Sequence, residues 1–154
     1  IYTHDGELSK DNLPKIHFEK TVKADRKKVF DIAANYEEFQ KTLPQYFTSI
    51  RVRSTRDNVA VVEEHVMISG KELVMMTKHV TNYPETHEIF VIGGDAKGSY
   101  IAEHYQNIQN STKITIDADI KLKGALKIVG FFGKGKITKG LEKIMDEFAK
   151  IAES

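Results

Sequence analysis

Two short helical patterns stand directly between two strand patterns in residues 24–52, and this order restricts the fold more than any other feature of the chain. Asp25 can cap a first helix near 26–34, because its carboxylate accepts hydrogen bonds from the free amides of the first turn. A second helical piece at 36–43 ends before Pro44, which cannot continue the helix hydrogen bonds. Beyond it, apolar and polar residues alternate, so a strand begins.

Seven strands are predicted in all. The first, at 15–23, precedes the helix pair, and turn signals separate the six that follow it: 46–55, 59–68, 71–81, 86–92, 99–108 and 112–123. Links this short indicate antiparallel hairpins. In the last strand the aliphatic residues face one way and the polar residues the other, so one face of the sheet meets water.

The chain ends in an amphipathic helix whose apolar residues recur at spacings of three and four. They are Ile137, Leu141, Ile144, Met145, Phe148, Ile151 and Ala152. This stripe must pack on the sheet. A chain of 154 residues without repeats or a flexible linker favours one domain, at 14–154, preceded by a polar N-terminal extension at 1–13.

Composition excludes several classes of function. The absence of cysteine excludes disulfides, thiolate catalysis and cysteine-ligated zinc, and fits a reducing compartment. A formal net charge of +1 argues against a nucleic-acid binder. No apolar run resembles a signal peptide or reaches membrane-spanning length. We therefore expect a cytoplasmic protein, peripheral to a membrane at most.

The segment Val22–Pro44, VKADRKKVFDIAANYEEFQKTLP, resembles a pattern of the START, birch-pollen-allergen and polyketide cyclase superfamily, abbreviated SRPBCC. Within that superfamily, the chain is most similar to the polyketide cyclase/dehydrase and coenzyme Q-binding branch. The resemblance implies an α+β helix-grip fold: a curved antiparallel sheet of about seven strands, two short helices after the first strand, and a long C-terminal helix across the sheet. The motif consists of packing residues, so it indicates fold more than function.

The same resemblance implies a cavity between the sheet and the last helix. It predicts binding and transport of a hydrophobic small molecule: a lipid, an isoprenoid quinone or a polyketide-like compound, with no cofactor. The residues expected to line the site are Ile116, Ile120, Phe131, Phe132, Leu141, Met145 and Phe148. The alternative for each helix position is an ordinary filled core, because an apolar stripe is primarily packing.

Residues 121–143 interleave lysines with aliphatic and phenylalanine side chains. Such a surface suits contact with anionic lipid headgroups, and Lys127, Lys134 and Lys136 are the predicted membrane-surface residues. The alternative is a solvated loop whose phenylalanines cover the cavity.

Four histidines, His65, His79, His87 and His104, stand on different predicted strands, and acid/base catalysis would follow if they shared the cavity with Glu63 and Tyr100. Hairpin counting places His87 roughly opposite His104, and with Tyr100 they form the candidate acid/base groups of a cyclase or aromatase. The alternative is a set of surface or hydrogen-bonded histidines, and no HxH or HExxH pair suggests a metal. Glu63 and Glu64 are adjacent and point to opposite faces of a strand, so they form no paired unit. A third possibility, from relatives that inhibit ribosome association, is a ribosome- or protein-interaction module.

Overall fold

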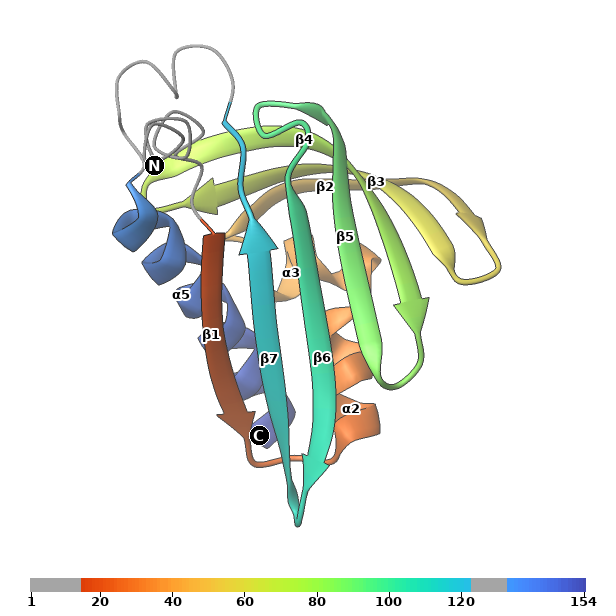
Figure 1. Cartoon of the computed structure of the whole chain (residues 1–154). Helices are drawn as coiled ribbons and strands as arrows, with labels where there is room; N and C mark the ends of the chain where they lie inside the picture. The colour runs from red at the N-terminus through yellow and green to blue at the C-terminus, as the bar shows by residue number, and fades with distance from the viewer. Residues whose placement is uncertain (1–14, 123–132) are drawn as a thin grey trace, which may run out of the picture.

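The computed structural model describes residues 15–122 and 133–154 (Figure 1). Its elements follow the predicted order of strand, helix pair, six strands and long helix. They are β1 (Lys15–Val22), α2 (Arg26–Ala33), the 3-10 helix η1 (Tyr36–Glu38), α3 (Phe39–Thr42), β2 (Phe47–Arg56), β3 (Val59–Ile68), β4 (Lys71–Asn82), β5 (Thr86–Gly94), β6 (Tyr100–Ile108), β7 (Ser111–Asp119) and α5 (Lys134–Glu153). The predicted α+β helix-grip architecture is confirmed.

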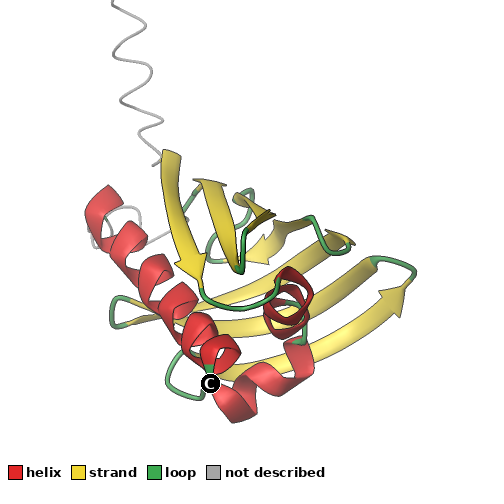
Figure 2. Ribbon diagram, turned by 90° about the horizontal axis from the view of Figure 1, so that it is seen from below, coloured by secondary structure: helices red, strands yellow, loops and turns green. Residues whose placement is uncertain are grey.

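All seven strands form one antiparallel sheet in the order β1-β7-β6-β5-β4-β3-β2. Strands β2 to β7 lie side by side in the order of the sequence, and β1 pairs with β7 at one edge of the sheet. The sheet curves around α5, with the short helices α2 and α3 at one end (Figures 1 and 2). The concave face and α5 enclose the core.

The helix pair forms for the reason that its sequence predicts. The side chain of Asp25 accepts hydrogen bonds from the backbone amides of Lys27, at 3.0 Å, and Lys28, at 3.4 Å. Phe30 in α2 and Phe39 in α3 are buried on the inner side. These aromatic rings attach the pair to the core, so burial stabilises two helices that are too short to be stable alone.

The N-terminal half of α5 is held against the β3–β4 turn. Gly140 allows this approach, because a Cβ atom there would lie 2.7 Å from Cγ2 of Ile68. The Oγ atom of Ser69 donates to the carbonyl oxygen of Lys136 at 2.6 Å. The turn thus holds one end of the helix. In its C-terminal half, Asp146 pairs with Lys20 of β1 at 2.7 Å, and Glu153 accepts from the amide of Lys23 at 2.9 Å.

The sheet is irregular where β5 leaves β6. Their ladder covers only Thr86–Phe90 on β5, and a register shift interrupts the β4–β5 ladder between Met76 and Thr77. Gly94 has a φ angle of +93°, and a Cβ atom there would lie 2.1 Å from the carbonyl oxygen of Val74. Only glycine fits so close to another backbone.

Strand β7 ends earlier than its alternation predicts, at Asp119. Beyond Asp119 the backbone no longer forms strand hydrogen bonds. Instead, the amide of Lys121 donates to the side-chain Oγ of Ser99 at 2.7 Å.

Candidate functional site

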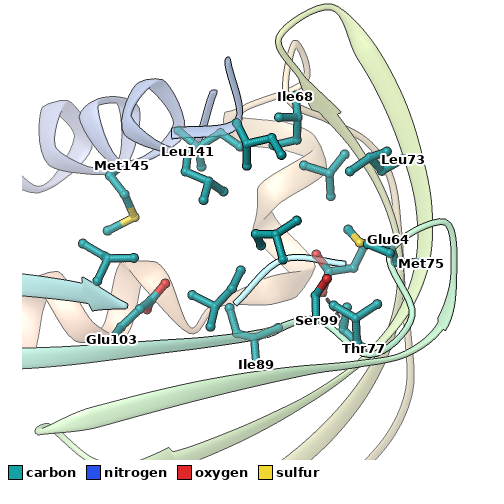
Figure 3. A pocket seen from close by; sticks show the side chains of 18 of the residues that line it. Glu64, Ile68, Leu73, Met75, Thr77, Ile89, Ser99, Glu103, Leu141 and Met145 are labelled. Atoms are coloured by element: carbon teal, nitrogen blue, oxygen red, sulfur yellow. Dashed lines mark hydrogen bonds between the residues drawn. The ribbon is translucent and has the colours of Figure 1, made fainter. Parts of the chain in front are cut away.

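A cavity lies between the concave face of the sheet and α5 (Figure 3). Its volume is about 130 Å³. A single water occupies only about 10–15 Å³ of such a cavity, so there is room for a ligand of several heavy atoms. Most of its lining is aliphatic or aromatic, including Leu73, Met75 and Ile89 from the strands and Leu141 and Met145 from α5.

The structure places five of the predicted ligand residues in this lining: Ile116, Ile120, Leu141, Met145 and Phe148. Ile116 belongs to β7 and Ile120 follows it directly, whereas the other three belong to α5. Phe131 and Phe132 lie outside the described residues, as does Lys127. Ligand contact by the two phenylalanines and membrane contact by Lys127 remain predictions.

One wall of the cavity is polar and carries a buried hydrogen-bonded chain formed by Glu64, His79, His87 and Glu103. We name it the Glu–His chain. Its members come from four adjacent strands, β3, β4, β5 and β6, and all four line the cavity. Inward-facing residues alternate along each strand, and these four side chains all point to the inner face of the sheet, so they reach the same wall.

Three contacts connect the Glu–His chain. Oε2 of Glu64 lies 2.6 Å from Nε2 of His79. Nδ1 of His79 lies 2.9 Å from Nε2 of His87, and Nδ1 of His87 lies 2.9 Å from Oε1 of Glu103. The exposed fractions of the four residues are only 2–8%. Buried polar groups are normally hydrogen-bonded, and here each ring nitrogen has a partner.

Three hydroxyl groups form hydrogen bonds with members of the Glu–His chain. Thr77 hydrogen-bonds to Oε2 of Glu64, and Tyr105 donates to Oε1 of Glu103 at 2.7 Å. The hydroxyl of Tyr36 in η1 lies 3.3 Å from Nε2 of His87. The helix pair thus supplies a side chain to the site.

Electrostatics keep the tyrosines as donors and Glu103 ionised. Burial, reinforced by the charges of Glu103 and Glu64, raises the pKa of Tyr36. Burial, with the charge of Glu103, likewise raises the pKa of Tyr105 well above its ordinary value. Burial acts to raise the pKa of Glu103, but the charge of His87 and hydrogen bonds from His87 and Tyr105 outweigh it, so that pKa is lowered. Glu103 is therefore a carboxylate at neutral pH.

The geometry also determines how many protons the Glu–His chain holds. Each of its three contacts needs one proton between the two heavy atoms, since none or two would bring lone pairs or N–H groups face to face. Three contacts therefore hold three protons. Two ionised carboxylates and two neutral rings would account for only two of these protons and a charge of −2, so the third proton brings the net charge of the Glu–His chain to −1. Moving protons along the chain changes which group is charged but not this total.

The other two catalytic candidates lie elsewhere. The register of β5 and β6 pairs His87 with Glu103 and His104 with Thr86, one residue away from the expected pairing. His104 consequently points away from His87 and is exposed, because a shift of one residue reverses the face of a strand. The hydroxyl of Tyr100 donates to Glu88, outside the cavity lining. Of the three candidates, only His87 lines the cavity.

The sequence predicted His79 and His87 among the strand histidines that could share the cavity, but it missed Glu64 and Glu103 and named Glu63 as the carboxylate instead. It placed Glu63 and Glu64 on opposite faces, and the structure agrees: Glu63 pairs with Arg53 at 3.3 Å on the exposed side. The available signal was a charged residue among inward-facing aliphatic positions of β3, where Val62 and Val66 flank Glu64 at spacings of two.

Among the described residues, no group of three His, Cys, Asp or Glu side chains is arranged to hold a metal ion. In the same part of the chain, no helix is long and apolar enough to cross a membrane. Lys134 and Lys136 lie exposed in the first turn of α5.

No family model matches this chain, and no curated protein is significantly similar to it in sequence. Solved structures do match in fold. A START superfamily protein from Mycobacterium smegmatis superposes with a TM-score of 0.75 at 14% identity, covering 90% of this chain and 97% of its own. The Zhui aromatase/cyclase from Streptomyces sp. R1128 gives 0.71 at 13% identity, covering 92% and 94%. A major latex-like protein from Panax ginseng gives 0.67 at 13%, covering 92% and 98%.

The fold and the cavity define a helix-grip protein. More narrowly, the chain has the SRPBCC fold that the Val22–Pro44 segment predicts. Identities this low establish the fold alone, so function must be argued from the cavity.

Proposed function

We propose that this protein binds a hydrophobic small molecule in the cavity between its sheet and α5. The observation that carries the proposal is the cavity itself, whose lining is mainly aliphatic and aromatic. Ligand sites are typically apolar pockets with a few polar groups that fix orientation. The Glu–His chain supplies such groups along one wall, so the pocket has a body for apolar atoms and a wall for a polar head.

The direct test is identification of a bound molecule. Native mass spectrometry of the purified protein should reveal added mass, and solvent extraction should release a lipid, a quinone or a polyketide-like compound. A protein that carries no added mass and binds none of these three classes when they are offered would contradict the proposal.

A pair of variants on α5 tests the location. Leu141→Trp places a larger side chain in the cavity, while Lys143→Trp adds the same ring on the exposed side of the same helix. We expect the first to lower ligand affinity about tenfold or more and the second to leave it within about twofold, since only the first removes volume from the site. Equal effects would place the ligand elsewhere.

A second candidate function is acid–base catalysis by a cyclase or aromatase. The specific observation in its favour is the buried contact between His79 and His87, whose rings share a proton beside the cavity. A general base must lie within hydrogen-bond reach of the proton that it removes from the substrate. This candidate predicts conversion of a bound polyketide that is lost in His87→Gln and retained in His104→Ala.

We also propose that the protein exchanges its ligand at an anionic membrane surface. Lys134 and Lys136 support this step, because both are exposed at the end of α5 that borders the cavity residues Ile137 and Leu141. Replacing both lysines by Glu should abolish co-sedimentation with phosphatidylserine vesicles. The matched control is Lys23→Glu together with Lys28→Glu, near the opposite end of the molecule, which should not.

A further inference from the structure

The Glu–His chain introduces a net negative charge into the cavity wall. The cavity lining contains no lysine or arginine within the described part of the chain. Arg26 approaches from α2, but its guanidinium donates to the carbonyl oxygen of Tyr105 at 3.5 Å and is not part of the lining. The total of −1 therefore faces apolar side chains and the cavity space.

Two carboxylate oxygens also remain open. Both hydrogen bonds to Glu64 fall on Oε2, and both to Glu103 fall on Oε1. Within the described residues, no donor contacts Oε1 of Glu64 or Oε2 of Glu103. Every fully buried side-chain oxygen among the described residues has a hydrogen-bond partner. These two oxygens have none there, so each must keep some accessible surface. Figure 3 shows both carboxylates directed into the cavity.

A buried charge is costly unless an opposite charge or several hydrogen bonds compensate it. The protein compensates the inner oxygen of each carboxylate with two contacts, and leaves the outer oxygens and the net charge to whatever occupies the cavity. Both features require the same partner: a group that donates hydrogen bonds and carries a positive charge.

We infer that the cavity selects a hydrophobic molecule with a protonated amine, whose N–H groups donate to the open oxygens of Glu64 or Glu103 while its apolar part lies against α5. This inference rests on the proposed binding function and adds the chemical class of the ligand. A carboxylate head would face the same negative wall and two atoms that can only accept, so fatty acids are disfavoured. A neutral alcohol lies between the two, because it donates one hydrogen bond but brings no charge.

Three ligands of one chain length test the inference: decylamine, decanol and decanoate, each below its aggregation concentration at pH 7 and measured by isothermal titration calorimetry. An alkyl amine is protonated at this pH, as lysine is. We expect the amine to bind about tenfold or more tightly than the alcohol, and decanoate to bind most weakly, since hydrogen bonds to charged groups exceed neutral ones by this amount.

Matched variants identify the groups responsible. Glu64→Gln and Glu103→Gln each keep the side-chain shape and remove the charge, so each should bring amine and alcohol affinities closer by about tenfold. Glu88→Gln is the control, because Glu88 lies on β5 beside His87 but bonds to Tyr100 outside the cavity. It should preserve the preference. If a variant in the Glu–His chain fails to fold, the comparison of three ligands on the native protein remains decisive.

The outcomes separate the two levels of argument. Binding of decanol or decanoate as tightly as the amine would overturn the inference and leave the proposed function standing. Failure of all three ligands, together with an empty cavity by mass spectrometry, would overturn the proposed function. An amine preference that survives both Gln variants would also overturn the inference, because the charge would then come from elsewhere.

Discussion

Nδ1 of His79 lies 2.9 Å from Nε2 of His87, and the two rings lie edge to edge, with their centroids 5.1 Å apart and their planes inclined by 26°. Two imidazole nitrogens this close must share one proton, since a lone pair has to accept what the other ring donates. Each outer nitrogen faces a glutamate, so the two rings are fixed in orientation from both sides. The pair is therefore an organised part of the cavity wall and not two separate core histidines.

A shared proton should be visible by nuclear magnetic resonance. With ¹⁵N-labelled histidine, we expect slowly exchanging low-field proton signals from the rings of His79 and His87, because these N–H groups are buried and hydrogen-bonded. Substitution of His79 by Gln should remove its own signals and shift those of His87. The exposed His104 serves as the internal control and should give no slowly exchanging ring proton. Rapid exchange at all three histidines would contradict the hydrogen-bonded arrangement.

Removal of His87 should destabilise the fold strongly. His87→Ala removes one of the two hydrogen-bond partners of Oε1 of Glu103 and the partner of Nδ1 of His79, in a wall that is almost completely buried. We expect a loss of about 3 kcal/mol in the free energy of unfolding, measured by urea denaturation. His104→Ala, one residue past Glu103 on the exposed face, should change it by less than about 0.5 kcal/mol. Similar losses in both variants would refute the assignment.

The fold was predictable because its patterns are local. Period-two alternation marks the strands, and the cap at Asp25 with the break at Pro44 marks the helix pair. These signals depend on residues a few positions apart, and each element buries the face that its own pattern defines. Even so, the last strand ends earlier than its alternation predicts, because the amide of Lys121 donates to the side chain of Ser99 and not to a neighbouring strand.

The site was less predictable because it depends on registers. The Glu–His chain needs the pairing of β3 with β4, β4 with β5 and β5 with β6 to be correct at once. A shift of one residue in the β5–β6 hairpin was enough to predict His104 in the place of Glu103. Tyr36 adds a contact from the helix pair, whose motif indicates packing alone. Long-range side-chain contacts of this kind have no local signature.

The lowered pKa of Glu103 predicts a specific pH dependence. A carboxyl group with a pKa lowered by folding stabilises the native state above its unfolded pKa of about 4.5, and this contribution disappears as the pH falls through the lower native value. The difference in unfolding free energy between the native protein and Glu103→Gln should thus be constant from pH 7 to about 5.5 and shrink towards pH 4. Urea denaturation at several pH values measures it.

The control for that experiment is Glu142→Gln, which removes a carboxylate from the exposed side of α5. The double difference between the two variants isolates the buried group from the general effect of charge. If the difference in unfolding free energy between the native protein and Glu103→Gln stayed constant down to pH 4, His87 and Tyr105 would not stabilise the ionised form of Glu103.

The position of α5 over the cavity depends on Gly140. A Cβ atom there would meet Cγ2 of Ile68 at 2.7 Å and the backbone nitrogen of Ser69 at 3.2 Å, whereas a Cβ atom at Gly135, on the same helix, would meet nothing within 4 Å. Alanine improves helix propensity at either position by up to about 1 kcal/mol. We expect Gly135→Ala to be neutral or stabilising and Gly140→Ala to be less stable than it by about 1–3 kcal/mol, because the helix must move off the β3–β4 turn.

Ligand binding gives this pair of glycine variants a second measurement. If the helix shifts, the cavity residues Leu141 and Met145 shift with it, so Gly140→Ala should weaken amphiphile binding while Gly135→Ala leaves it unchanged. Thermal unfolding and calorimetric titration on the same two proteins measure both effects. Equal stability and equal affinity would show that the turn tolerates a side chain at position 140, and that the seating of α5 does not depend on this close contact.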